Sequence, residues 1–248
     1  MAIESTPLAE INSLKFYHGT SNLFATAILK SPKTSVFPYE QCLQLGQTLF
    51  KRCMSHVDAW IDLAVFFQEA GCKNWSNAPL GLKNIADGVR NSSVEYGALY
   101  ATPDPMMAQN YTIRNKCGSE LITTLQSAIQ ALAFHEDVHF DEFRAKFPEF
   151  FRIVEIRHDP VVLEFTGLSL DQLAQENGDR DIKNIIQLCL DHARNGESLP
   201  DVAFRIDGLC PSQISAVFPL TDAAALPFNH KDFESRRILS DYWLRSQA

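Results

Sequence analysis

The chain has 248 residues, of which 46% are hydrophobic, 21% are charged and 10% are aromatic, and its formal net charge is −8. This apolar content excludes an intrinsically disordered chain, and the length allows a sizeable core in one or two domains. No apolar stretch approaches the roughly 20 residues of a membrane-spanning helix, and the acidic balance disfavours binding to nucleic acid, whose phosphates attract clustered Lys and Arg. We therefore expect a globular protein with neither a membrane nor a nucleic-acid partner.

The N-terminal segment and the cysteines bear on the cellular compartment. The segment MAIESTPLAEINSLKF has neither the basic start nor the apolar stretch of a secretory signal peptide. The six cysteines are irregularly spaced and form no C-x-x-C pair, which favours reduced thiols over disulfides or a cysteine zinc site. We expect a cytoplasmic protein, or one that is secreted without a signal peptide into another cell.

Hydrophobic patterns predict strands and helices along the whole chain. Strands are expected at 14–18, 97–102, 151–156, 160–165, 202–206 and 214–220. Helices are expected at 21–30, 39–71, 105–110, 119–134, 141–147, 169–176 and 180–194, with loops at 31–40 and 74–84 and a helical or frayed tail from 229. Strands that come from distant parts of the sequence, with helices between them, predict an α+β fold. We expect a single domain, 1–248, with a helical insertion at about 39–95.

A polar segment with the sequence Phe-Tyr-His-Gly-Thr-Ser occupies positions 16–21. His18 and Thr20 can bind ribose hydroxyls, and Gly19 lets the backbone come close enough to pair with an amide. An ordinary turn between a strand and a helix, with Ser21 as the helix cap, uses the same residue types.

Two tyrosines mark a second segment. Tyr100 ends a predicted strand, and Tyr111 lies eleven residues further on, near the end of a short helix that Asp104 is expected to cap. Two aromatic rings in these places can hold a flat ring between them, because aromatic faces stack. The alternative is that both rings pack in the core with their hydroxyls satisfied.

Taken together, the His-Gly-Thr of positions 18–20, Tyr100 and the pair Ala108 and Tyr111 resemble the ADP-ribosyltransferase superfamily. The closer likeness is to the branch of diphtheria toxin and the poly(ADP-ribose) polymerases. The resemblance implies an ADP-ribosyltransferase-like fold, with two small β-sheets around a cleft for NAD. It also implies cleavage of the bond between nicotinamide and ribose.

The resemblance assigns a role to each matching residue. The Gly19 backbone would bind the nicotinamide carboxamide, and His18 would bind a ribose hydroxyl and orient NAD. Thr20 would add a hydroxyl near the amide or the ribose. Tyr100 and Tyr111 would hold the nicotinamide ring, with Tyr111 stacking on it.

The third catalytic position of that family is a Glu near the start of a late strand, where it stabilises an oxocarbenium-like transition state. The best match is Asp201, and Glu197 is the rival. Asp is one methylene shorter than Glu, which changes where the charge sits, and a solvated turn after Pro200 is the alternative interpretation of Asp201. Position 199 is Leu199, which does not fit the Glu/Gln-x-Glu pair of the arginine-specific branch.

A competing motif, H-E-x-x-H, runs from His135 to His139. On a helix it would place two imidazoles on one face for zinc, with Glu136 as the base for a bound water. The surrounding residues are acidic, and no further His follows at metzincin spacing. These features favour a solvated polar segment, and no metal is expected.

The leading hypothesis is an NAD-dependent ADP-ribosyltransferase with His18, Tyr100 and Asp201 as catalytic residues and NAD as its substrate. Its acceptor is expected to be a protein, as for the toxins and effectors of this superfamily, and the segments 31–40 and 73–95 are candidates for selecting it. One alternative is a non-catalytic module that binds NAD or ADP-ribose. Another is a zinc hydrolase that uses His135, Glu136 and His139.

Overall fold

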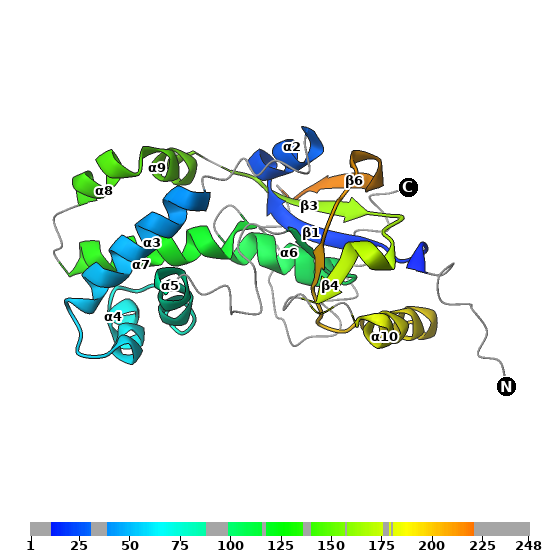
Figure 1. Cartoon of the computed structure of the whole chain (residues 1–248), viewed down its shortest axis with the longest axis horizontal. Helices are drawn as coiled ribbons and strands as arrows, with labels where there is room; N and C mark the ends of the chain where they lie inside the picture. Colours follow the sequence, from blue (N-terminus) through cyan, green and yellow to red (C-terminus); the bar gives the residue numbers. More distant parts are fainter. Residues whose placement is uncertain are drawn as a thin grey trace. The chain divides into compact units, whose positions relative to one another are not determined.

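The computed structural model describes residues 11–30, 39–87, 99–115, 118–135, 140–156, 158–175, 179 and 181–220 (Figure 1). Residue contacts divide the chain into two compact units: unit 1 comprises 1–34, 98–114 and 159–248, and unit 2 comprises 35–97 and 115–158. The described strands all lie in unit 1, and the described elements of unit 2 are helices. This confirms the α+β class. The insertion expected at about 39–95 lies in unit 2, which also includes residues 115–158. That the chain forms a single domain stays a prediction.

Unit 1 contains two three-stranded antiparallel sheets. The first sheet has the strand order β1 (Phe16–Ser21), β3 (Pro160–Phe165) and β6 (Ile214–Pro219). The second has the order β2 (Leu99–Ala101), β5 (Phe204–Ile206) and β4 (Leu173–Gln175). A bridge joins the two sheets, because Tyr17 N–H donates to the Thr102 carbonyl at 2.7 Å and Thr102 N–H donates back at 2.9 Å.

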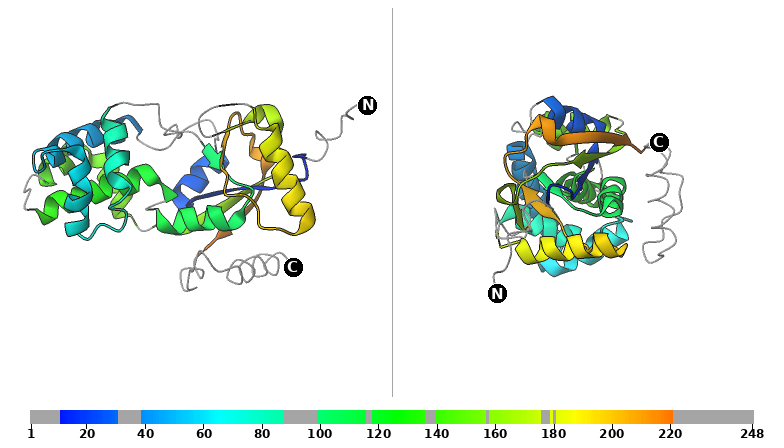
Figure 2. Two further views of the ribbon diagram at one scale, coloured as in Figure 1. Left: turned by 90° about the horizontal axis from the view of Figure 1, so that it is seen from below. Right: turned by 90° about the vertical axis from the view of Figure 1, so that its right-hand side faces the viewer.

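One core serves both sheets of unit 1. Alternation along the strands directs Phe16, Leu163 and Phe165 to the same side, where they contact Phe204 and Ile206 of the second sheet. The rings of Phe16 and Phe204 meet edge to face, with their centroids 5.8 Å apart. Helix α10 (Lys183–Asn195), yellow in Figure 2, covers this core with Ile186, Cys189 and Leu190, and α2 (Asn22–Lys30) adds Ala25.

The opposite face of the first sheet carries α6 (Pro105–Arg114). Gly19 makes this approach possible, since a Cβ at that position would lie 2.0 Å from the Ala108 carbonyl oxygen. The Thr112 hydroxyl donates a hydrogen bond to the Thr20 carbonyl. Asp104 caps the helix, as predicted, by accepting from the Met106 N–H at 2.8 Å.

Two similar turns carry the chain from one sheet to the other, one between β3 and β4 and one between β5 and β6. Each passes a glycine in the left-handed region, Gly167 or Gly208, and ends in a glutamine, Gln172 or Gln213. Gln172 donates to the Gly208 carbonyl at 3.1 Å, and Gln213 donates to the Gly167 carbonyl at 2.8 Å. The two side-chain amides also bond each other. We refer to these segments as the paired turns; their 3-10 helices are η3 (Leu170–Gln172) and η4 (Pro211–Gln213).

Unit 2 is built around three helices that contact one another, α3 (Tyr39–Met54), α5 (Ala78–Ala86) and α7 (Glu120–Phe134). Ser119 begins α7 by accepting from the Ile122 N–H at 3.3 Å. The other helices are η1 (Trp60–Asp62), α4 (Leu63–Glu69), α8 (Phe140–Lys146) and α9 (Pro148–Glu155). None of the helices in the described ranges has the length and apolar character that crossing a bilayer requires.

The strand predicted at 151–156 is wrong, because these residues lie in α9 and the turn after it. Pro148 occupies the first turn of this helix, where its missing N–H costs nothing. Phe150, Phe151 and Ile153 are buried together at helical spacing. The alternating letters of FRIVEI therefore fit a helix face as well as a strand.

Other elements also differ from the prediction. The helix expected at 39–71 is interrupted after Met54, and α5 begins inside the loop expected at 74–84 and continues to Ala86. The helix expected at 169–176 is the short η3 followed by strand β4. Residues 31–38 of the expected loop, and the tail from 229, lie outside the described residues.

Candidate functional site

The candidate residues of the first predicted segment lie on β1, and the two tyrosines lie on β2 and α6, all in unit 1. The structure brings His18 and Tyr100 together although 82 positions separate them: His18 Nδ1 is 2.6 Å from the Tyr100 carbonyl oxygen. This contact lies one residue beyond the bridge between Tyr17 and Thr102, where the two sheets meet.

The hydrogen bond to Tyr100 fixes the tautomer of His18. A carbonyl oxygen only accepts, so Nδ1 carries the proton and Nε2 of the neutral ring is an acceptor. Burial lowers the pKa of His18 from 6.5 to about 4, and the bond to the carbonyl opposes this shift. The imidazole is therefore neutral near pH 7 and can accept a hydrogen bond from a ligand hydroxyl.

The backbone of Gly19 lies at the edge of β1 that faces the second sheet. Tyr17 directs its N–H and C=O toward β2, and alternate residues of a strand direct these groups to the same edge. Gly19 is two residues further on, and within the described ranges the bridge between Tyr17 and Thr102, the residue after β2, is the one backbone pairing that joins β1 to this segment. A ligand amide has the donor and the acceptor that these two groups would pair with.

Neither tyrosine ring belongs to the apolar core of unit 1. The Tyr111 side chain is 40% exposed on α6. Tyr100 lies directly opposite Arg205 of β5, and both point away from the face on which Phe204 and Ile206 are buried. The exposure of Tyr111 does not fit the alternative in which both rings fill the core.

The structure places the two candidate acids differently. Asp201 is exposed and precedes the start of β5 at Phe204 by three residues. Glu197 is held at the end of α10, because its N–H donates to the His192 carbonyl at 2.9 Å and its carboxylate lies 3.5 Å from His192 Nδ1. Among the described residues no hydrogen bond or ion pair joins either acid to His18. The engagement of Glu197 favours Asp201 as the acid.

Arg205 is a residue that the sequence prediction missed. It shares a face of the second sheet with Tyr100, and its guanidinium lies 3.2 Å from the Asp207 carboxylate. The alternation of the segment 202–206 could have predicted this position. Phe204 and Ile206 face the core, so the residue between them must face the other way. A cation on that face suits a ligand phosphate.

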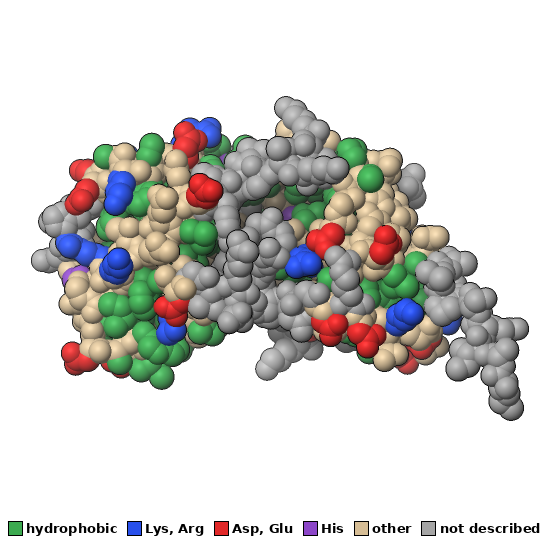
Figure 3. Space-filling model, in the orientation of Figure 1, with side chains coloured by type: hydrophobic (Ala, Val, Ile, Leu, Met, Phe, Trp, Pro, Cys, Tyr) green, Lys and Arg blue, Asp and Glu red, His purple; other side chains and the backbone are tan. Residues whose placement is uncertain are grey.

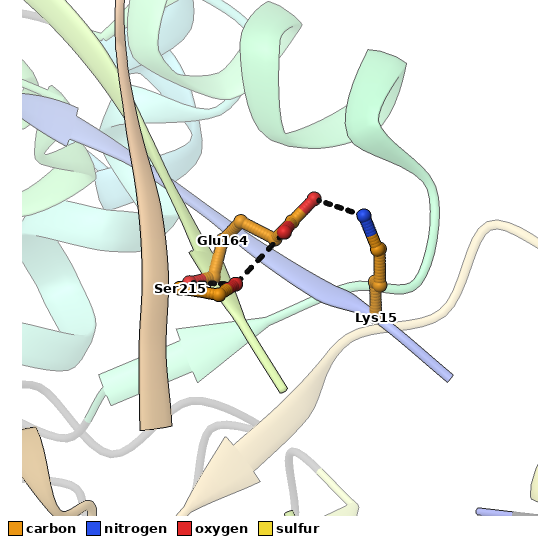
Figure 4. A network of polar contacts seen from close by, with 3 residues as sticks. All are labelled: Lys15, Glu164 and Ser215. Carbon is orange, nitrogen blue, oxygen red and sulfur yellow. Dashed lines mark hydrogen bonds and ion pairs between the residues drawn. The ribbon is translucent and has the colours of Figure 1, made fainter. Parts of the chain in front are cut away.

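A buried carboxylate lies behind the candidate site, on the α6 side of the first sheet. Glu164 is 4% exposed; Lys15 Nζ is 3.1 Å from one oxygen and the Ser215 hydroxyl donates to the other at 2.8 Å (Figure 4). Burial, followed by the charge of Glu164, raises the pKa of Tyr17, which lies opposite on β1. The His18 side chain faces the other side of this sheet, so Glu164 does not face the imidazole, and its bonds to Lys15 and Ser215 anchor the sheet.

The competing zinc motif is only partly described. His135 ends α7, and its ring stacks on Phe66 with the centroids 4.2 Å apart. Glu136 to His139 lie outside the described residues. In the part of the chain that the structure describes, no three His, Cys, Asp or Glu side chains are grouped as metal ligands.

Among the residues that the structure describes, the cysteines are free thiols. Four of them, Cys42, Cys53, Cys72 and Cys189, are buried and Cys210 is exposed, whereas Cys117 lies outside the described residues.

A hollow on the surface of unit 1 is lined by Ser13, Leu14, Leu190, Ala193 and Arg194. None of the candidate site residues lines this hollow.

Comparisons of the chain with protein-family models, with curated proteins and with solved structures gave no significant match. The function is therefore argued from two sources. One is the geometry around His18, Gly19 and Tyr100, and the other is the resemblance of the motifs.

Proposed function

We propose that the protein is an NAD-dependent ADP-ribosyltransferase with an ADP-ribosyltransferase-like fold, and that the His18 and Tyr100 region binds NAD. The observation that carries the proposal is the hydrogen bond between His18 Nδ1 and the Tyr100 carbonyl, next to the edge of β1 at Gly19, which pairs with no other strand among the described residues. It joins the two motif segments across two small sheets. The motif resemblance alone does not require these segments to meet.

Four parts of NAD have a matching group in this proposal: the carboxamide, a ribose hydroxyl, the nicotinamide ring and the diphosphate. The nicotinamide carboxamide pairs with the Gly19 N–H and C=O, because it offers one acceptor and two donors. A ribose hydroxyl donates to His18 Nε2. The exposed ring of Tyr111 stacks on the nicotinamide, and Arg205 offers a cation to the diphosphate.

The reaction breaks the bond between nicotinamide nitrogen and ribose C1′. The electron pair leaves with nicotinamide, which departs neutral, while positive charge develops on the ribose. A carboxylate fixed beforehand stabilises this charge, and we assign that role to Asp201. A nucleophile of the acceptor then bonds to C1′ and loses its proton. The acceptor in this proposal is a protein, and water would give hydrolysis instead.

One observation favours a second candidate, a module that binds NAD or ADP-ribose without catalysis. Asp201 is exposed and lies outside the strand, and a displacement of about 1 Å at a reacting centre can cost on the order of a hundredfold in rate. Such a protein would keep the contacts of His18 and Gly19 and lack turnover.

Calorimetric titration with NAD tests the site. We expect binding to wild type, weaker binding to His18→Ala, and a loss of about 1 kcal/mol in Tyr111→Ala, where ring stacking is removed. His158→Ala is the matched control, because His158 bonds the Ile153 carbonyl in unit 2, outside the proposed site. Unchanged NAD affinity in both His18→Ala and Tyr111→Ala would refute the site.

A second assay separates the enzyme from the binding module. Release of nicotinamide and labelling of protein with ADP-ribose are followed in a cell extract. The enzyme predicts that Asp201→Asn loses turnover and keeps NAD affinity. Binding without any nicotinamide release in wild type would favour the non-catalytic module.

A further inference from the structure

An exposed apolar surface covers neighbouring helices of unit 2. Figure 3 shows hydrophobic side chains gathered over α4 and α5. Four large side chains contribute: Trp60 is 38% exposed, Ile61 66%, Val65 56% and Leu80 52%. We refer to these four residues as the α4–α5 apolar face.

The helical spacing and one contact make this face continuous. Ile61 and Val65 are four residues apart on η1 and α4, so they lie on the same side. Leu80 and Lys83 are three residues apart on α5 and share a side in the same way. The Lys83 amine lies 5.9 Å from the centre of the Trp60 ring, which joins the two helices at the surface.

The border of the face is acidic. Asp58 and Asp62 flank Trp60 and Ile61 in the chain, Glu69 lies one turn beyond Val65, and all three are exposed. The amine of Lys83 is already paired with the carboxylate of Asp87. The segment 58–87 contains four carboxylate side chains and two lysines, so its charge is negative.

The proposed NAD site uses none of these residues. Exposed apolar clusters with a polar border mark interaction surfaces, and tryptophan is enriched among the residues that dominate such contacts. The negative charge of the border distinguishes between the possible binding partners of this face. It repels the anionic surface of a cytoplasmic membrane leaflet, and a two-fold contact with a second copy would set one acidic border against another.

We propose that the α4–α5 apolar face docks an amphipathic helix of another protein, whose apolar side is bordered by Lys and Arg. The apolar side of that helix covers Ile61, Val65 and Leu80. Its basic residues lie against Asp58 and Glu69. This proposal holds whether or not the protein is a transferase.

A synthetic peptide tests the proposal. It has about 18 residues, or five helical turns, with leucines on one side and lysines along the border. A second peptide carries glutamates in place of the lysines. Binding of each labelled peptide to the full chain is followed by fluorescence anisotropy, for wild type, Ile61→Asp, Val65→Asp and Leu188→Asp. Leu188 is 46% exposed on α10 of unit 1, which makes it a matched control.

The lysine peptide is expected to bind wild type and Leu188→Asp equally, and at least about tenfold more weakly to Ile61→Asp and Val65→Asp. The added carboxylate attracts lysine, so a loss of affinity reports the missing apolar contact. The glutamate peptide should bind at least about tenfold more weakly than the lysine peptide, and Asp58→Lys with Glu69→Lys should reverse that preference. NAD affinity should stay unchanged in Ile61→Asp, which keeps this test separate from the proposed function.

Three results would overturn the proposal. The first is equal affinity for both peptides, or affinity for the lysine peptide that Ile61→Asp leaves unchanged. The second is a dimer of wild type in sedimentation that Ile61→Asp dissociates, which would identify a second copy as the occupant. The third is co-sedimentation with phosphatidylglycerol vesicles that Ile61→Asp abolishes, which would identify a membrane surface.

Discussion

Replacing Gly19 with alanine tests the contact between β1 and α6. The new Cβ would lie 2.0 Å from the Ala108 carbonyl oxygen, 3.0 Å from its carbon and 3.1 Å from the Thr112 nitrogen. Ordinary contacts between such atoms are about 3.5 Å, so the helix must move from the strand by on the order of 1.5 Å. These are backbone atoms of α6, so no side chain can turn aside to make room.

The expected loss of stability follows from this displacement. Overpacking costs about 1–3 kcal/mol, and a clash with helix backbone belongs at the upper end of that range. The movement also strains the hydrogen bond from Thr112 to Thr20, which is worth about 1 kcal/mol. We therefore expect the free energy of unfolding to fall by about 3 kcal/mol or more, which for a chain of this size lowers the thermal midpoint by about 6–12 °C.

Urea unfolding followed by circular dichroism measures this change. Gly81→Ala is the matched control, because its Cβ would meet side-chain atoms of Thr124, with Oγ1 at 3.1 Å and Cγ2 at 3.4 Å, and no backbone atom among its three nearest neighbours. Alanine also gains about 1 kcal/mol over glycine inside a helix, so this variant should be at least as stable as wild type. A Gly19→Ala protein within about 1 kcal/mol of wild type would refute the close approach of β1 and α6.

Three further predictions, made with four single substitutions and one double variant, test individual contacts by the free energy of unfolding. The free energy of unfolding of wild type should fall as pH falls from about 6.5 to about 4, because unfolding lets His18 bind a proton that burial excludes. This pH dependence, at most about 1.4 kcal/mol per pH unit, should be absent in His18→Gln. Thr112→Val should cost about 1 kcal/mol by removing the donor to the Thr20 carbonyl. Gln172→Ala and Gln213→Ala should each destabilise, and their double variant should cost less than the sum, because they share bonds; strict additivity would contradict this.

The sequence predicted correctly those helices and strands whose first residue and hydrophobic period can both be recognised from neighbouring residues. The helix expected at 119–134 is α7, which Ser119 caps and which buries residues at helical spacing, and the strand expected at 160–165 is β3. The same signals failed at 151–156, where Phe151 and Ile153 suit either a strand or the buried face of a helix. Only packing within unit 2 decides between these two interpretations.

The candidate site was predictable as a set of residues and not as an arrangement. The spacing of His18 and Tyr100 says nothing about the 2.6 Å between the imidazole and the carbonyl, which depends on the bridge between two sheets. Arg205 was missed although the alternation of its strand contains the signal. The paired turns were also missed, since two short segments with a glycine five residues before a glutamine gain meaning only when Gln172 and Gln213 bond each other.

The crossings made by the paired turns affect how the chain can fold during its synthesis. Because β3 leads into the second sheet and β5 leads back to the first, neither sheet is complete until late residues leave the ribosome: Ile206 for the second sheet and Pro219 for the first. Unit 2 ends at His158, so its contacts are available while β5 and β6 are still being made. The helical unit can therefore form first on the ribosome, and His18 must wait for strands translated nearly 200 residues after it before its final surroundings exist.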